Sequence, residues 1–162
     1  IKRSFPVAVN LGAMDGAFTG SLVGANGIQD VIELELCPAF ASTNPKRAVA
    51  DEEWLPLRAQ SIDLVISNPP YISAAAIPAL APEVADHDPL PALDGGEDGL
   101  MAYRALAPDA VRLLRPGGIL ALEIGQGQGD SVRAIMASAG LPTIGSRADL
   151  AGIERCIICA RG

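Results

Sequence analysis

Short apolar runs recur along the chain, and turn-forming residues separate them. Two clear examples are residues 62–67 (IDLVIS) and 119–124 (ILALEI). Their length and their content of Val, Ile and Leu are typical of strands that are buried in a parallel sheet. We expect strands over residues 6–11, 30–36, 47–50, 62–67, 119–124, 142–146 and 155–160.

Helices are predicted between several of these strands. Residues 99–114 form the clearest helix, which should end at the Arg-Pro-Gly-Gly turn that follows it. Residues 130–139 predict a further helix, with Gly140 as its C-cap. Weaker helical patterns cover residues 15–25, which glycines interrupt, and residues 38–44, which a proline stops.

The alternation of strands with helices predicts an α/β fold, in which helices cover both faces of a parallel sheet. Such sheets bind ligands at the carboxyl ends of their strands, near the point where the strand order reverses. A length of 162 residues suits a single domain, residues 1–162. The Ala- and Pro-rich residues 73–91 form the one long irregular connection, and long loops in compact domains tend to be functional.

The charge balance argues against nucleic acid as a partner. The chain has 12 Lys and Arg residues against 19 Asp and Glu residues, which gives a net charge of −7. An acidic domain is poorly suited to gripping a phosphate backbone. No apolar stretch reaches the ~20 residues that span a bilayer, and no charged-then-apolar leader opens the chain, so we expect no membrane association.

The cysteines indicate a reducing compartment. Their odd number, without a signal peptide, predicts a cytoplasmic protein whose three cysteines are Cys37, Cys156 and Cys159. Cys156 and Cys159 fall in a predicted strand, where positions three apart face opposite sides, so they cannot chelate one metal ion. The acidic residues 51–53 lack the spacing of metal ligands, and no metal site is expected.

A candidate cofactor site follows from residues at the ends of successive predicted strands. Residues 10–16 (NLGAMDG) link the first strand to a helix, and glycine in such a turn lets the backbone approach a ligand. Glu35, about twenty residues further on, is placed to accept both hydroxyl hydrogens of a ribose. Asp51 or Glu52, after the third strand, would accept an adenine amino hydrogen. The alternative is an ordinary turn followed by solvated carboxylates.

The sharpest signal is Ser-Asn-Pro-Pro-Tyr-Ile, residues 67–72, at the carboxyl end of a predicted buried strand. Two consecutive prolines restrict the backbone, so the Asn68 side chain and the Pro69 carbonyl are held rigidly. Two acceptors side by side suit a planar NH2 group, which offers two hydrogens. Tyr71 would stack on the planar group of the substrate. The alternative is a turn that ends the strand and buries Tyr71.

Both parts of the chain resemble class I S-adenosylmethionine-dependent methyltransferases. Residues 6–67 resemble the cofactor-binding half of these enzymes, and residues 49–56 (VADEEWLP) resemble the branch for biotin synthesis and complex I assembly. From residue 62 onward the chain closely resembles the protein-(glutamine-N5) methyltransferases of peptide-chain release factors. Beyond Asn-Pro-Pro-Tyr-Ile, the matching runs are residues 80–84, 92–96, 98–100, 103–104, 122–125 and 149–152.

The resemblance implies a Rossmann-like class I methyltransferase, with a mostly parallel central sheet, helices on both faces and a terminal antiparallel strand. It implies S-adenosyl-L-methionine as cofactor and S-adenosyl-L-homocysteine as product. The implied methyl acceptor is the glutamine amide in a Gly-Gly-Gln loop of a release factor. The implied catalytic residues are Asn68, Pro69 and Tyr71, which together with Pro70 bind the substrate. The implied cofactor-binding residues are Asn10, Gly12, Ala13, Gly16, Glu35, Asp51, Glu52 and Asn68.

Several departures from the family pattern keep alternatives open. Asn10 stands where the family has an acid, and Met14 stands where it has the central glycine of the first motif. We expect the chain to lack the helical amino-terminal domain of the family, and the two halves resemble different branches, which suggests a chimera. The alternatives are therefore a folded but catalytically impaired domain and an N6-adenine methyltransferase. The only histidine, His87, is interpreted as a solvated loop residue instead of a catalytic base.

Overall fold

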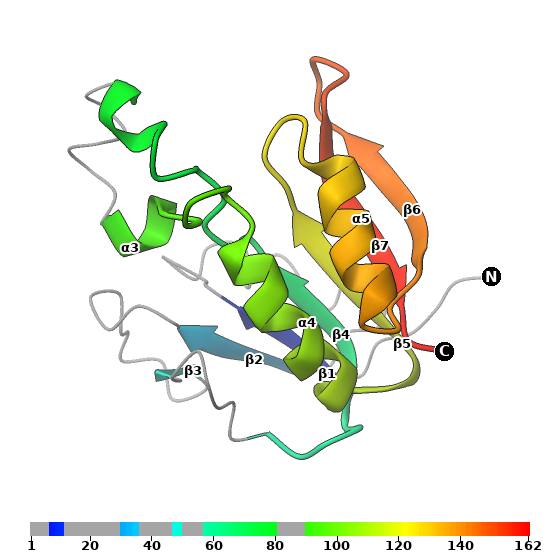
Figure 1. The fold of residues 1–162 in the computed structure, drawn as a ribbon. Helices are drawn as coiled ribbons and strands as arrows, with labels where there is room; N and C mark the ends of the chain where they lie inside the picture. Colours follow the sequence, from blue (N-terminus) through cyan, green and yellow to red (C-terminus); the bar gives the residue numbers. More distant parts are fainter. Residues whose placement is uncertain (1–6, 12–29, 36–46, 50–56, 81–89) are drawn as a thin grey trace.

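The computed structural model describes residues 7–11, 30–35, 47–49, 57–80 and 90–162 of the chain. In these residues a sheet of seven strands runs in the order β3-β2-β1-β4-β5-β7-β6 (Figure 1). The strands are β1 (Val7–Leu11), β2 (Asp30–Glu35), β3 (Arg47–Val49), β4 (Ile62–Ser67), β5 (Leu114–Glu123), β6 (Thr143–Ala148) and β7 (Glu154–Ala160). The helices are η3 (Ile77–Ala79), α3 (Leu90–Leu93), α4 (Met101–Leu113) and α5 (Gly129–Ser138).

The sheet is mixed. Strand β1 pairs in parallel with β2 and β4, β2 pairs in parallel with β3, and β4 pairs in parallel with β5. Strand β7 is antiparallel to both of its neighbours, β5 and β6. Each strand predicted from the apolar runs is present, and β4 has the predicted bounds. The pattern therefore located the strands well, because each is a short apolar run bounded by turn residues.

The junction of α4 and β5 differs from the prediction. The helix begins at Met101, not at residue 99, because Gly99 has a φ of +74°, which a helix does not accept. It ends at Leu113, and β5 begins at the next residue instead of at Ile119. Leu114 still pairs with Ile62, whereas the next pair joins Leu64 to Ile119, so the turn between bulges out of the ladder.

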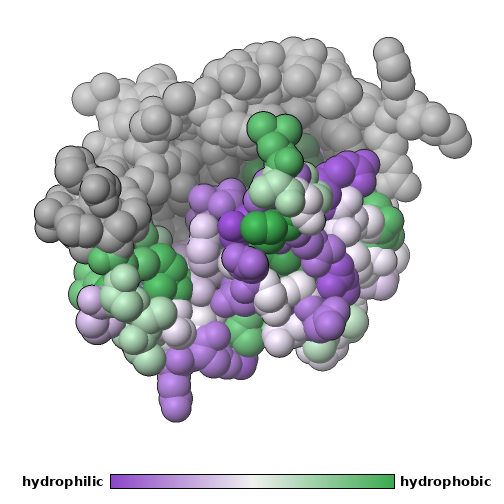
Figure 2. Space-filling view, turned by 90° about the horizontal axis from the view of Figure 1, so that it is seen from above, coloured by the Kyte–Doolittle hydropathy of each residue, from purple (hydrophilic) through white to green (hydrophobic). Residues whose placement is uncertain are grey.

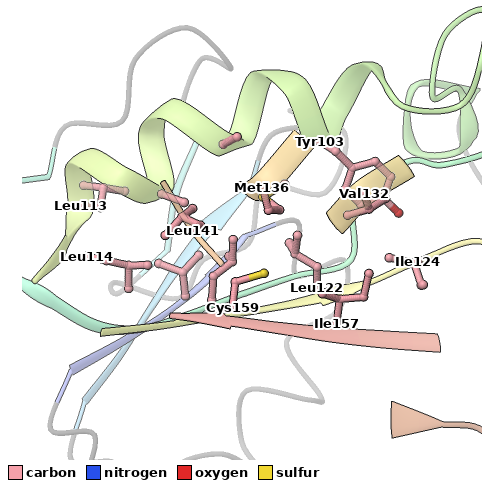
Figure 3. Packing of buried hydrophobic residues seen from close by; sticks show 14 of the residues in the cluster. Tyr103, Leu113, Leu114, Leu122, Ile124, Val132, Met136, Leu141, Ile157 and Cys159 are labelled. Atoms are coloured by element: carbon pink, nitrogen blue, oxygen red, sulfur yellow. The ribbon is translucent and has the colours of Figure 1, made fainter. Parts of the chain in front are cut away.

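The main hydrophobic core lies between helices α4 and α5 and one face of β4, β5 and β7 (Figure 3). Both helices lie on this face of the sheet (Figure 1). The helices contribute side chains such as Tyr103, Leu113 and Met136, and the strands contribute Leu122 and Ile157, all fully buried. Figure 3 shows these side chains pointing toward one another between the two layers.

A second, smaller cluster lies on the opposite face of the sheet. It is formed by Leu64 and Ile119, with Ile66, Ile158 and Ala160 packed against them. The segments predicted as helices over residues 15–25 and 38–44 lie outside the described residues. The described helices α4 and α5 therefore cover one face, and helices on the second face stay a prediction.

Hydrophilic residues take up much of the described surface when the molecule is seen from above (Figure 2). The large apolar side chains that remain exposed in the described part are Leu90, Met101, Ile144 and Leu150. None of the described helices is long and apolar enough to cross a membrane.

Candidate functional site

The carboxyl ends of the parallel strands lie in register along one edge of the sheet. Leu11, the last residue of β1, pairs with Leu34 on one side and with Ser67, the last residue of β4, on the other. Glu35, which ends β2, pairs with Val49, which ends β3. The chain order reverses at β1, between β2 and β4. In open α/β sheets this switch point is where ligands bind.

Two of the predicted cofactor residues, Asn10 and Glu35, lie in described strands at this edge. Asn10 lies in β1, opposite Glu33 and Ile66, one residue before the end of the strand. Glu35 is the last residue of β2. Residues 12–29 and 50–56 lie outside the described residues, so the positions of Gly12, Ala13, Gly16, Asp51 and Glu52 stay predictions, and the same holds for His87.

The Asn-Pro-Pro-Tyr segment leaves β4 at the same edge. Asn68 directly follows Ser67 and is exposed, whereas Pro69 is buried. Pro70 and Tyr71 are half-buried. The side-chain amide of Asn68 is therefore exposed to solvent at the switch point, while the next residue, Pro69, is packed into the protein.

The end of this segment is fastened to a distant loop by main-chain hydrogen bonds. The N–H of Ile72 donates to the carbonyl of Leu93 at 3.1 Å, and the N–H of Gly95 donates to the carbonyl of Ile72 at 2.8 Å. The N–H of Ala74 donates to the carbonyl of Gly96 at 2.9 Å. The irregular connection after Tyr71 therefore closes back on itself, and its two ends stay beside the end of β4.

Gln128 links the segment to two other loops, and the sequence reasoning missed it. Its Nε2 donates to the carbonyls of Tyr71 at 2.9 Å and of Gly99 at 3.1 Å, and its Oε1 accepts from the N–H of Gly125 at 3.0 Å. The only local signal is a glutamine in a Gly-Gln-Gly-Gln-Gly run before a predicted helix. Nothing in that run indicates which loops meet there.

Tyr71, the last residue of this segment, lies near Tyr103 and Glu123. Tyr103 is fully buried, and its hydroxyl donates to the main-chain carbonyl of Glu123 at 2.9 Å. Burial raises the pKa of Tyr103, and the neighbouring Tyr71 raises it further. Burial also raises the pKa of Tyr71, and the negative charge of Glu123 adds to this effect. Both phenols are therefore neutral hydrogen-bond donors at neutral pH.

The two cysteines of the final strand lie in different surroundings. Cys159 is buried in the main core together with Ile157, whereas Ile158 belongs to the cluster on the other face. Cys156 has the strand parity of Ile158, so the two cysteines face opposite sides, as predicted. Burial raises the pKa of both thiols, which disfavours the reactive thiolate. Among the described residues, no group of three or more His, Cys, Asp and Glu is placed to hold a metal ion.

A pocket in the described part of the chain lies at the start of α5, and Asn68 is not among its lining residues. Its lining includes Ile124, Asp130, Arg133 and Glu154. Arg133 forms ion pairs with both Asp130 and Glu154, so the charged groups of this pocket satisfy one another. The exposed amide of Asn68 at the switch point is therefore the stronger candidate for chemistry.

Several solved structures that match this chain are named methyltransferases. A methyltransferase from Pyrococcus furiosus matches with a TM-score of 0.70 at 16% identity, over 100% of this chain and 78% of that chain. The release-factor-specific protein-(glutamine-N5) methyltransferase from Alicyclobacillus acidocaldarius matches with a TM-score of 0.58 at 26% identity, over 96% and 79%. The chain has a methyltransferase fold.

Curated proteins that resemble this methyltransferase-fold chain in sequence are named release factor glutamine methyltransferases. The protein from Gloeobacter violaceus is 53% identical over 165 aligned residues, which cover 96% of this chain and 57% of that protein. The protein from Cereibacter sphaeroides is 37% identical, over 97% and 60%. No protein-family model matches the chain.

The chain spans less than two thirds of the length of these relatives, 57% and 60% for the two just named. Both alignments run through nearly all of this chain, and so include its first half as well as its second. The predicted resemblance of residues 49–56 to the biotin-synthesis branch, and the chimera that it suggested, stay predictions.

Proposed function

We propose that the chain is the catalytic domain of an S-adenosylmethionine-dependent N-methyltransferase that acts on the side-chain amide of a glutamine in a peptide-chain release factor. The observation that carries the proposal is the exposed Asn68 at the carboxyl end of β4, beside the end of β1. The names of the curated relatives support the same substrate class. The proposed methyl acceptor is the glutamine of a Gly-Gly-Gln loop in the release factor. The proposed location of the chain is the cytoplasm.

The proposed catalytic residues are Asn68, Pro69 and Tyr71. The amide oxygen of Asn68 and the carbonyl of Pro69 accept the two hydrogens of the glutamine NH2 group. An amide nitrogen is a poor nucleophile because its lone pair is delocalised. Holding both hydrogens orients the nitrogen toward the methyl donor, so catalysis here is orientation and electrostatic stabilisation. Tyr71, neutral at physiological pH, packs on the planar amide together with Pro70.

When bound, S-adenosylmethionine would supply an electrophilic methyl group on a positively charged sulfur to the oriented amide nitrogen, leaving S-adenosylhomocysteine and a proton that would pass to solvent. The residues proposed to hold the cofactor are Asn10, Gly12, Ala13, Gly16, Glu35, Asp51, Glu52 and Asn68. Support for this set comes from the register of the strand ends, which aligns β1, β2, β3 and β4 along one edge.

Calorimetric titration with S-adenosylmethionine and S-adenosylhomocysteine tests the cofactor half of the proposal. We expect saturable one-to-one binding to the 162-residue chain. Met14 and Asn10 replace the family's glycine and acid, so absence of binding up to millimolar ligand would favour the catalytically impaired domain.

Methyl transfer to a release factor with a Gly-Gly-Gln loop tests the proposed substrate. We expect transfer to the wild-type factor, none to a factor whose loop glutamine is replaced by alanine, and loss of at least about a hundredfold in rate for Asn68→Ala. Gln126→Ala removes an exposed amide elsewhere and serves as the control. Cofactor binding should be unchanged in Gln126→Ala. It should persist in Asn68→Ala with weaker affinity, because the other residues proposed to hold the cofactor remain. Transfer to adenine in DNA, with none to the release factor, would contradict the proposal and favour the adenine methyltransferase.

A further inference from the structure

Gln128 stands at the start of α5, but its side chain does not cap that helix. It turns instead toward three loops and uses both ends of its amide. The two N–H bonds of Nε2 are directed at the carbonyls of Tyr71 and Gly99, and Oε1 accepts from Gly125. The partners fix the orientation of the amide, because carbonyls require the nitrogen and an N–H requires the oxygen.

The absence of side chains at two glycines, Gly99 and Gly125, provides the space that the Gln128 side chain occupies. A Cβ on Gly99 would lie 2.5 Å from the carbonyl oxygen of Tyr71 and 2.7 Å from Nε2 of Gln128. A Cβ on Gly125 would lie 2.7 Å from Oε1 of Gln128 and 3.0 Å from the ring of Tyr71. The three loops therefore converge on the glutamine more closely than any side chain at these two positions would permit.

We propose that Gln128 is the positioning residue that fixes the Asn68–Tyr71 segment, an inference that rests on the proposed function. The segment is held at one end by β4, where Ser67 pairs with both Leu11 and Leu122. Gln128 holds its other end through the carbonyl of Tyr71. Pro69 and Pro70 lie between the two anchors and have fixed φ angles, so the acceptors of Asn68 and Pro69 are oriented from both sides.

Two substitutions of Gln128 distinguish the hydrogen bonds that its amide donates from the one that it accepts. In Gln128→Glu, the carboxylate still accepts from Gly125 but offers no donor to the carbonyls of Tyr71 and Gly99, which then face a negative charge. Gln128→Met keeps the length of the side chain and removes all three hydrogen bonds. Gln126→Glu and Gln126→Met make the same chemical changes two residues away, at an exposed position that the proposal assigns no role.

Hydrogen exchange in the protein without ligands is the first readout, because it does not depend on activity. We expect the amides of Ile72, Ala74 and Gly95 to exchange about tenfold faster in both Gln128 variants, since local opening becomes easier when the loop loses its tie. The amide of Leu141, bonded to the carbonyl of Met136, should not change. Unchanged exchange at Ile72, Ala74 and Gly95, relative to the Gln126 variants, would overturn the proposal.

Kinetics give the second readout. A displaced acceptor pair should lower kcat by about 10- to 100-fold, whereas the Kd of S-adenosylmethionine should stay within about twofold. An unchanged kcat would overturn the positioning role. If the wild-type chain transfers no methyl group, the proposed function fails, and the exchange data still decide whether Gln128 fixes the segment.

If the variants fail to fold, scalar couplings across hydrogen bonds in the wild-type protein provide a measurement that needs no substitution. We expect couplings from the Nε2 group of Gln128 to the carbonyl carbons of Tyr71 and Gly99. Rapid solvent exchange of this NH2 group, without either coupling, would overturn the inference.

Discussion

The hydroxyl group of Tyr103 in α4 donates a hydrogen bond to the main-chain carbonyl of Glu123, at the end of β5, at 2.9 Å. The two residues are 20 positions apart, and the bond joins the first turn of a helix to the edge of the sheet where Asn68 emerges. Because Tyr103 is fully buried, its hydroxyl would otherwise have no hydrogen-bond partner, and the bond helps to hold α4 against the sheet.

Replacing Tyr103 by phenylalanine removes this bond and leaves the packing of the ring in place. We expect the free energy of unfolding to fall by about 1 kcal/mol, the usual net contribution of a buried hydrogen bond. Urea unfolding monitored by circular dichroism measures it. Unchanged stability of Tyr103→Phe would contradict the contribution assigned to this bond.

Tyrosine ionisation provides a test of the pKa shifts. The chain has two tyrosines, Tyr71 and Tyr103, and burial raises the pKa of both. The tyrosinate absorbance of the folded protein should therefore rise only at a pH above about 10, the pKa expected for tyrosine in the urea-unfolded chain. The unfolded chain loses these protons first. Stability is therefore full below about pH 10 and falls as the pH rises further.

Tyr71→Phe leaves Tyr103 as the only tyrosine and isolates its titration. We expect the remaining transition at a pH above that of the wild-type midpoint, because burial affects Tyr103 more. A midpoint near 10 in the folded variant would contradict the burial of Tyr103.

Substitutions at two glycines with a left-handed backbone, Gly99 and Gly117, separate the cost of a steric clash from the cost of backbone strain. A Cβ added to Gly99 (φ +74°) would lie 2.5 Å from a main-chain oxygen, whereas a Cβ added to Gly117 (φ +77°) would meet nothing within 4 Å. Gly117→Ala should cost about 1–2 kcal/mol, for the conformation alone. Gly99→Ala should cost at least about 1 kcal/mol more, because the Tyr71 carbonyl has to move. Thermal and urea unfolding of both variants measure the difference, and equal costs would contradict the close approach at Gly99.

The main core should respond strongly to truncation. Leu122→Ala removes a fully buried side chain between β5 and the two helices, and we expect a loss of about 2–5 kcal/mol in the free energy of unfolding (Figure 3). The control is Leu150→Ala, at a fully exposed leucine, which should change stability by less than about 0.5 kcal/mol. Similar effects of the two substitutions in urea unfolding would contradict this placement of the core.

The strands and the position of the Asn-Pro-Pro-Tyr segment were predictable because their causes are local. A short apolar run such as residues 62–67 has to be buried, and a Pro-Pro pair directly after it ends the strand wherever the chain is placed. The prediction was less accurate for β5, which starts at Leu114 because that residue pairs with Ile62, a partner far away in the sequence.

The sequence by itself determined which residues stand at the ends of strands, and therefore that Asn68 and Glu35 are candidates for one site. Only the tertiary structure decided which strand ends are neighbours, with Leu11 opposite Ser67, and which side chain holds the segment in place. Gln128 acts on the carbonyl of Tyr71 from 57 residues away. A hydrogen bond between such distant positions depends on how the chain is packed, and no local pattern of hydrophobic and polar residues encodes it.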